Sequence, residues 1–170
     1  NNWEYDYVDQ PYLVCTDSTG NIFNMYLNGK TIVEHISDFS PRHYFAFEDM
    51  NGDNIKDYIY LDRNRLFVYN QDTSKIFDYT FQDINPEEKK AAPSLVFIEN
   101  NGSPEIAIVS KKSSQIYIFN SDGSLKKDFP VKGSTLFEVV SFSGPTTFQK
   151  KPKRYFATGE GKNLYFYSFK

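Results

Sequence analysis

Apolar and polar residues alternate along much of this chain with a period of two, which places every second side chain on the same face of a β-strand. The clearest stretch predicts four strands separated by short polar loops: Tyr44–Glu48, Asp57–Leu61, Arg65–Asn70 and Lys75–Phe81. Short loops favour antiparallel hairpins, and the dipeptides Asn28-Gly29 and Asp122-Gly123 are typical of tight hairpin turns. The pattern predicts an all-β fold.

Part of this pattern recurs about every 45 to 50 residues. Leu66–Asn70 corresponds to Ile116–Asn120, and Leu164–Ser168 and Ile22–Tyr26 are looser copies. Repeats of this length are typical of a β-propeller, whose blades are small twisted sheets that must cover one another. We expect a propeller, or part of one, of about four blades, each a four-stranded antiparallel sheet. The blades would span approximately residues 3–37, 44–82, 94–131 and 135–170 of a single domain, and the last lacks a clear fourth strand.

Aromatic residues are unusually frequent, since 16 Phe, 13 Tyr and one Trp make up 18% of the 170 residues. Such side chains favour the half-buried surface of a sheet. Many stand at alternate positions of the predicted strands: Tyr58/Tyr60, Phe67/Tyr69, Tyr117/Phe119 and Tyr165/Tyr167. Packing between blades explains these stripes better than a carbohydrate-binding platform does, because alternate positions of blade strands must be buried.

Charged residues exclude one class of function and mark two surface segments. A net charge of −3 offers no broad positive field for a phosphate backbone, so nucleic acid is not an expected partner. The basic cluster Lys150–Arg154 is interpreted as a solvated loop that protects a strand edge. Asn85–Glu88 carries the cap and charge signals of a short helix, which Pro93 prevents from extending, and is interpreted as a surface connector.

A loop between two predicted strands carries the best candidate chemistry. Asp49, Asn51, Asp53 and Asp57 stand at its first, third, fifth and ninth places, and Ile55 can add its backbone carbonyl. Gly52 permits a sharp bend. Calcium takes six to eight oxygen ligands, and alternate residues of a tightly turning loop can supply them. The spacing predicts a structural calcium site formed by these five residues.

Two other interpretations of this loop are open. An EF-hand requires glycine at the sixth place and a bidentate Glu at the twelfth, where this chain has Asn54 and Tyr60. The flanking segments also alternate as strands do, so a helix-loop-helix unit is not expected. The other alternative is a polar turn that binds nothing, since Asp, Asn and Gly are common turn residues. Four oxygen-bearing side chains at this spacing exceed what a turn requires.

The segment Phe47–Asp57, together with the strands that follow it, resembles an FG-GAP or VCBS-type repeat of integrin-α-like propellers. The family's Asp-x-Asp/Asn-Gly-Asp loop, ending in Asp before an apolar strand, is matched at Asp49, Asn51, Gly52, Asp53 and Asp57. The resemblance implies calcium there and covers about 25 residues. The second copy has Glu99 and Asn101 but Ser103 in place of Asp53, and in the third copy Arg154 stands in place of Asp57. We expect no ion in that last blade, because Arg154 would repel it.

Other candidate chemistry is sparse. Cys15 is the single cysteine, expected to be a small buried hydrophobic residue, so an internal disulfide is excluded. A zinc site built from His35, His43 and Asp38 is conceivable, but ordinary packing histidines are the simpler interpretation. Serine nucleophile, phosphate-loop and metalloprotease motifs do not occur, nor does an apolar run long enough to span a membrane.

These observations lead to a functional expectation. The chain is predicted to be a non-catalytic, calcium-binding β-propeller module for protein recognition or scaffolding, placed extracellularly, in the periplasm or on the cell surface. Its partner would be an unidentified protein or glycan, and open blade edges could drive self-association. The alternative is a carbohydrate-binding or glycan-processing accessory domain of a secreted enzyme, with its cleft where loops of several blades converge.

Overall fold

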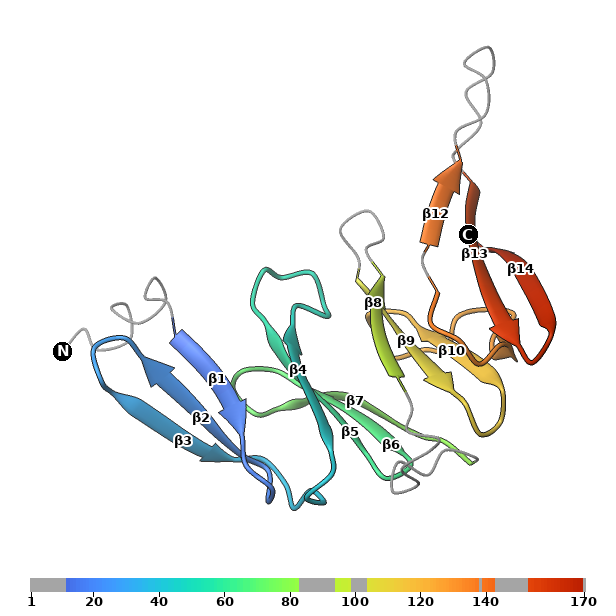
Figure 1. Cartoon of the computed structure of the whole chain (residues 1–170). Helices are drawn as coiled ribbons and strands as arrows, with labels where there is room; N and C mark the ends of the chain where they lie inside the picture. Colours follow the sequence, from blue (N-terminus) through green and yellow to red (C-terminus); the bar gives the residue numbers. More distant parts are fainter. Residues whose placement is uncertain (1–11, 83–93, 99–103, 138, 143–152, 170) are drawn as a thin grey trace, which may run out of the picture.

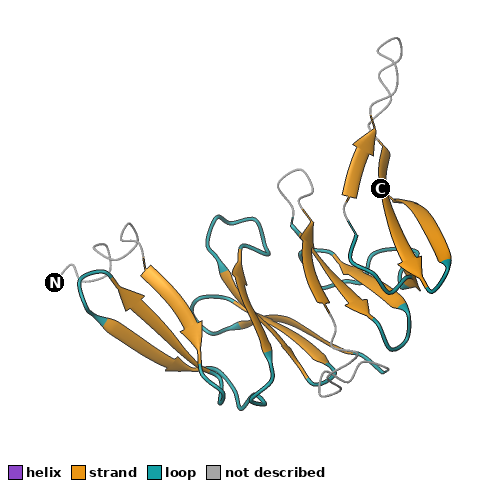
Figure 2. Cartoon of the chain, in the orientation of Figure 1, coloured by secondary structure: helices purple, strands orange, loops and turns teal. Residues whose placement is uncertain are grey.

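The computed structural model describes residues 12–82, 94–98, 104–137, 139–142 and 153–169. Over these residues the chain is all-β, with fourteen strands and no helix (Figure 2). The part described therefore contains no helix of the length and apolar character needed to cross a bilayer. The prediction of an all-β fold is confirmed.

The strands form four antiparallel sheets, each a simple meander in chain order. Sheet 1 contains β1 (Tyr12–Thr16), β2 (Asn21–Tyr26) and β3 (Thr31–His35). Sheet 2 contains β4 (Tyr44–Glu48), β5 (Asp57–Asp62), β6 (Arg65–Tyr69) and β7 (Lys75–Thr80). Sheet 3 contains β8 (Ser94–Ile98), β9 (Glu105–Ser110), β10 (Gln115–Phe119) and β11 (Val131–Lys132). Sheet 4 contains β12 (Val139–Phe142), β13 (Lys153–Glu160) and β14 (Asn163–Phe169).

The four sheets follow one another along an open arc, with sheet 1 at its N-terminal end and sheet 4 at its C-terminal end (Figure 1). Strand pairing stays within each sheet. Contact between sheets is therefore made by side chains on their faces, and the arc does not close into a ring.

The predicted strands of sheet 2 agree with the observed ones to within one residue at each end. The hairpin turns that follow β2, β6 and β10 share one hydrogen-bond pattern. In each turn the amide of its first residue donates to the carbonyl of its fifth, over 2.9 Å at Tyr26, 2.9 Å at Asn70 and 3.0 Å at Asn120. The fourth residue has positive φ, 86° at Gly29, 66° at Thr73 and 81° at Gly123. The three turns thus share one backbone conformation.

The hydrophobic core is divided into three clusters, one between each pair of consecutive sheets. The sheet 1–sheet 2 cluster is rich in aromatic residues, with the Tyr60 and Phe39 rings stacked 4.0 Å apart. The sheet 2–sheet 3 cluster is centred on aliphatic residues of β5 and β6 and on aromatic residues of β10. The third joins β9 and β10 to Phe156 of β13.

The third strand of sheet 2, β6, and the third strand of sheet 3, β10, direct alternate side chains to opposite neighbouring sheets. In β6, Leu66 and Val68 pack in the cluster shared with sheet 3, whereas Phe67 and Tyr69 pack in the cluster shared with sheet 1. In β10, Ile116 and Ile118 belong to the cluster shared with sheet 4, and Tyr117 and Phe119 to the one shared with sheet 2. We call the face toward the next sheet in the chain the forward face, and the opposite one the backward face. In β6 and β10, aliphatic residues occupy the forward face and aromatic residues the backward face.

The aromatic stripes are accounted for by this arrangement. Tyr58, Tyr60 and Tyr69 are buried against sheet 1, and Tyr117 and Phe119 against sheet 2. Tyr167 packs against the cluster shared with sheet 3. The interpretation of these stripes as packing between sheets is confirmed for the five buried residues, because their rings are not available to an external ligand, whereas Tyr167 is half-buried.

One expectation about the core is wrong. Cys15 is exposed. Its Cα partner on β2 is Phe23, on the backward face of sheet 1, and no described segment covers that face. Alternation alone placed Cys15 on a strand correctly, but it could not tell which of the two strand faces is covered.

Candidate calcium loop

The predicted metal loop joins β4 to β5 as a hairpin connection on sheet 2 (Figure 1). Residues Asn51–Lys56 are exposed, whereas Asp57 begins the buried strand β5 and is 1% exposed. Gly52 has φ 80°, as expected from its proposed role in the bend, and Asn54 has φ 68°. Asn is one of the few non-glycine residues that adopt this conformation readily. The loop therefore bends twice within three residues.

Loop side chains close the loop upon its own backbone. Asp49 accepts hydrogen bonds from the amides of Gly52, at 2.7 Å, and Asn54, at 2.8 Å. Asn51 Oδ1 accepts from the Asp53 amide at 2.9 Å, and Asp53 Oδ1 from the Ile55 amide at 2.7 Å. These bonds hold the loop in its bend, since oxygen-bearing side chains satisfy amides that a turn would otherwise leave to water.

Asp57 differs from the other loop carboxylates in its burial. Its Oδ2 accepts a hydrogen bond from the Met50 amide at 2.8 Å. Burial raises the pKa of the Asp57 carboxyl above its usual value, and the negative charges of Asp53 and Asp49 raise it further. Desolvation and like charges both disfavour the ionised form. A cation held among these three carboxylates would remove that penalty.

The proposed loop ligands have the right chemistry for calcium, but their side chains are not grouped closely enough to bind it as they stand. All of the predicted side-chain ligands are hard oxygen donors, which suits calcium. Each ionised carboxylate oxygen keeps acceptor capacity beyond its bond to an amide. However, in the part of the chain that the structure describes, no three His, Cys, Asp or Glu side chains are grouped closely enough to hold a metal ion. Ion binding would have to draw Asp49, Asp53 and Asp57 together.

Neighbouring residues that the sequence pattern did not suggest also contact the loop. Asn51 Nδ2 lies 3.0 Å from Asp53 Oδ2 and 3.5 Å from Asn70 Oδ1 in the turn after β6. Lys56 pairs with Glu48 across the base of the hairpin at 3.3 Å. Both the β6–β7 hairpin and the end of β4 therefore help to position the loop.

In sheet 3, a buried acid also begins the second strand, but it is neutralised by protein cations. Glu105 begins β9 as Asp57 begins β5, and it is 2% exposed. Its Oε1 forms an ion pair with Lys126 and lies 3.6 Å from Nη1 of Arg154 in β13. Two protein cations thus neutralise the buried acid of sheet 3. The degenerate loop at Glu99 and Asn101 lies outside the described residues.

This cluster corrects the interpretation of Arg154. The basic cluster was expected to be a solvated loop, but Arg154 lies on β13 with its side chain 12% exposed. Its partner Glu105 comes from the neighbouring sheet, which a short window of sequence does not reveal. Residues 150–152 of the cluster and the expected helix at 85–88 lie outside the described part of the chain.

The histidines are part of ordinary local structure. His35 Nε2 lies 3.5 Å from Asp38 at the surface, where both side chains are largely exposed. His43 Nδ1 lies 2.7 Å from the Ser40 carbonyl, and its ring packs near Phe39 and Tyr60. The two rings have separate partners, and the described residues offer them no third metal ligand.

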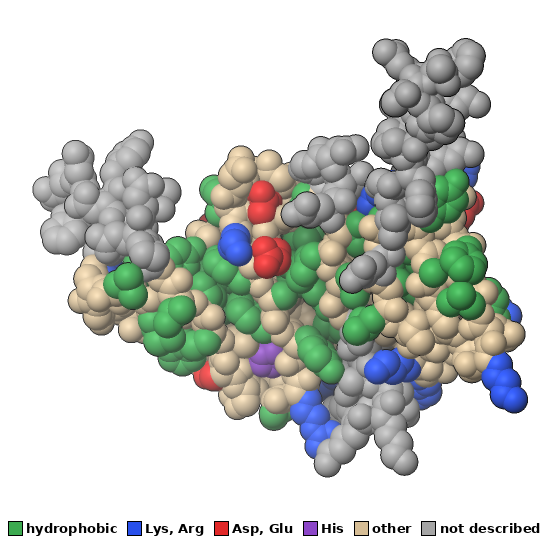
Figure 3. Space-filling model, turned by 45° about the horizontal axis from the view of Figure 1, so that its top comes forward, with side chains coloured by type: hydrophobic (Ala, Val, Ile, Leu, Met, Phe, Trp, Pro, Cys, Tyr) green, Lys and Arg blue, Asp and Glu red, His purple; other side chains and the backbone are tan. Residues whose placement is uncertain are grey.

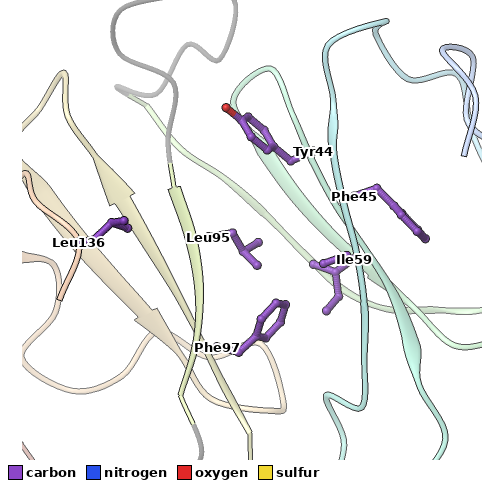
Figure 4. A pocket seen from close by; sticks show the side chains of 7 residues that line it. Tyr44, Phe45, Ile59, Leu95, Phe97 and Leu136 are labelled. Atoms are coloured by element: carbon purple, nitrogen blue, oxygen red, sulfur yellow. The ribbon is translucent and has the colours of Figure 1, made fainter. Parts of the chain in front are cut away.

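An apolar groove of about 420 Å³ lies between sheets 2 and 3. It is lined by residues from β4, β5 and β8 and by Leu136: Tyr44, Phe45, Ala46, Ile59, Leu95, Phe97 and Leu136. Tyr44, Leu95 and Phe97 lie around the space between β4 and β8 (Figure 4). Tyr44 and Phe97 are 41% and 37% exposed, so they are aromatic side chains that a ligand could reach.

Comparison with known proteins adds no assignment to this site. No protein-family model, curated protein or solved structure gives a match to the chain.

Proposed function

We propose that the chain is a non-catalytic, calcium-binding module of partial β-propeller type, which serves protein recognition or scaffolding outside the cytoplasm. The observation that carries the calcium assignment is the β4–β5 loop, where Asp49, Asn51, Asp53 and Asp57 stand along one bend and Asp57 is buried with a raised pKa. Four consecutive meander sheets that pack face to face along an arc support the propeller assignment.

The proposed role of the ion is structural. All five proposed ligands, including the Ile55 carbonyl, come from one segment, which suits an ion that fixes a hairpin rather than one that joins a substrate to the protein. Calcium would hold the β4–β5 connection and relieve repulsion around Asp57. With an affinity near 0.1 mM, as in extracellular modules, about 1 mM calcium stabilises the fold by roughly 1.4 kcal/mol.

Thermal unfolding in EDTA and in millimolar calcium tests the calcium assignment. We expect a higher midpoint in calcium, together with measurable heat on calorimetric titration. Asp57→Asn should abolish both responses, while Asp38→Asn, at an almost fully exposed acid outside the loop, should leave them unchanged. An unchanged midpoint and no heat for the unmodified chain would rule out calcium binding.

Carbohydrate binding is the second candidate, and the groove between sheets 2 and 3 favours it. Tyr44 and Phe97 present exposed aromatic surface there, and sugar rings stack on such surface. Binding on a glycan array that is lost in Tyr44→Ala would support this candidate. Capture of a specific protein from an extract, without response to glycans or hydrolase substrates, would support the recognition module. Fractionation of the native protein tests its placement outside the cytoplasm.

A further inference from the structure

Consecutive sheets contact each other in a similar way. In each case the strand with alternating side chains, β2, β6 or β10, turns one face toward the next sheet. The forward-facing pairs Leu66/Val68 and Ile116/Ile118 are 0% exposed. Each pair shares a cluster with backward-facing aromatic residues of the next sheet, Tyr117 and Phe119 in one case and Tyr167 in the other. In sheet 1, Ile22 is 0% exposed and Asn24 Nδ2 donates to the Tyr58 hydroxyl at 3.1 Å, so β2 uses the same face toward sheet 2.

The same strand is uncovered at the C-terminal end of the arc. Leu164 and Phe166 on β14 occupy the forward positions, opposite to Tyr167, which packs toward sheet 3. They are 63% and 71% exposed, whereas the equivalent pairs in sheets 2 and 3 are fully buried. Among the residues that the structure describes, no sheet packs on the forward face of sheet 4.

The N-terminal end presents the complementary backward face. Leu13 and Val33 are 65% and 55% exposed. Their Cα partners on β2 are Met25 and Phe23, so the four residues share the side of sheet 1 that points away from sheet 2. Cys15, also exposed, lies on this face. Phe23 and Met25 hold the positions that aromatic residues occupy in the later sheets.

The strand register places mostly apolar residues on both end faces, with Tyr155, Ser168 and Lys153 also on that of sheet 4. The described face of sheet 1 holds Leu13, Cys15, Phe23, Met25, Thr31 and Val33, with His35 at its end. Leu164, Phe166 and Ala157, whose Cα partner is Phe166, lie together on sheet 4. Hydrophobic side chains gather over both ends of the arc in Figure 3. Contiguous exposed apolar surface is typical of an interaction site.

We propose that the forward face of sheet 4 docks onto the backward face of sheet 1 of a second copy of this chain. This contact continues the sheet-to-sheet packing that already occurs three times within one chain. Because the two faces lie at opposite ends of an open arc, they do not meet within a single chain (Figure 1). The contact joins two different surfaces, so it is heterologous: it closes a ring if the rotation permits and otherwise builds a chain of copies.

Sedimentation of the chain over about a hundredfold range of concentration tests this docking. We expect assemblies of two or more copies to grow with concentration, equally in EDTA and in calcium. Their presence in EDTA separates the docking from the proposed calcium site, on which it does not depend. A monomer at every concentration would overturn the proposal.

Two charged substitutions distinguish the heterologous contact from a symmetric one. Leu13→Glu should disable the sheet 1 face and Phe166→Glu the sheet 4 face, and because both positions are exposed we expect the variants to fold. Each variant alone should assemble at least about tenfold more weakly. An equimolar mixture should form a heterodimer, since it retains one intact face of each kind. Undiminished self-association of either variant would contradict head-to-tail docking.

Two controls complete the experiment. Leu27→Glu places the same charge on a residue that is 76% exposed but lies in the β2–β3 turn, outside both faces, and should assemble as the unmodified chain does. Cys15, the single thiol, reports on the sheet 1 face. Its rate of modification by a thiol reagent should fall on assembly of the unmodified chain and stay high in Leu13→Glu. An unchanged rate during assembly would show that another surface mediates it.

Discussion

Tyr58 and Tyr60 bury their rings between sheets 1 and 2, with their hydroxyl groups reaching polar side chains of sheet 1. The Tyr58 hydroxyl accepts from Asn24, and the Tyr60 hydroxyl lies 3.4 Å from Thr16 Oγ1. Burial raises the pKa of Tyr58 to about 12, with the bond from Asn24 acting in the opposite sense. Burial likewise raises the pKa of Tyr60. Both residues must remain neutral for this interface to persist.

The protein should lose stability in alkali because of these tyrosines. The pKa of each tyrosine is higher in the folded state than its value of 10.0 in the unfolded chain. The stability that the neutral tyrosines contribute is therefore complete below pH 10 and is lost as the pH rises toward 12. The loss from Tyr58 alone is on the order of 2 kcal/mol. Tyr60→Phe should change stability at pH 7 little and flatten the loss above pH 10, as measured by urea unfolding across that range. An identical alkaline slope in the variant would contradict this.

Gly123 holds the turn after β10 against sheet 2. A Cβ at this position would lie 2.3 Å from Cγ of Phe77 on β7, and φ is 81°. Gly29 has the same place in the turn after β2 and a φ of 86°, but open space around it. The two glycines share a conformation and differ in surroundings.

Alanine at these two glycines should separate backbone strain from steric conflict. Gly29→Ala should cost about 1 kcal/mol, the strain of a left-handed alanine. Gly123→Ala should cost about 1 to 3 kcal/mol more, because Phe77 must move out of a packed interface. Urea unfolding of both variants measures the difference. Equal losses would show that Phe77 adapts without cost.

At the scale of the element, the sequence pattern correctly predicted the strands and turns that depend on neighbouring residues alone. The strands and turns of sheet 2 follow from strict alternation and from turn residues such as Gly52, so their bounds could be predicted from sequence. The loop's predicted ligands do lie along one bend, although they bind the loop's own amides. The exposure of Cys15 and the burial of Arg154 could not be predicted, because each depends on whether another sheet covers the residue. For the same reason the ion pair between Lys126 and Glu105, which are distant in sequence, could not be predicted.

The β4–β5 loop should respond to pH as well as to calcium. Because the pKa of Asp57 is raised above 3.8, this carboxyl takes up a proton at a higher pH than an ordinary aspartate. Proton and cation would compete for it. The stabilisation by calcium should therefore decline as pH falls toward the raised pKa, and Asp57→Asn should show no calcium-dependent midpoint at any pH. Melting curves with and without calcium at several pH values check this, and a calcium effect independent of pH would exclude Asp57 as a ligand.

At the scale of the molecule, one buried ionic cluster joins sheets 3 and 4. Glu105 stands on β9 and Arg154 on β13, and Lys126 follows the turn after β10. Their side chains are 3%, 12% and 10% exposed, so the charges interact away from bulk water. Buried charges are costly to leave without their counter-charges.

Removal of one cation from this cluster should destabilise the whole arc. Lys126→Met should cost about 3 kcal/mol, since Glu105 stays buried with less compensation. Lys75→Met offers a matched control, because its ion pair with Asp78 is at the surface and should be worth less than about 1 kcal/mol. Denaturant unfolding measures both losses. A double variant that adds Glu105→Gln should recover part of the loss, and no recovery would show that Lys126 acts through packing alone.

The alternating third strand has a consequence for how such a chain can change in evolution. Sheets 2 and 3 both offer the aliphatic residues of their third strand on one side and its aromatic residues on the other, so these two sheets present similar faces to their neighbours. Duplication or loss of one such unit in the gene would keep this part of each interface matched, whereas the Asn24–Tyr58 bond and the Glu105–Lys126–Arg154 cluster belong to single interfaces. The length of the arc could therefore vary by whole units if these polar contacts changed with it.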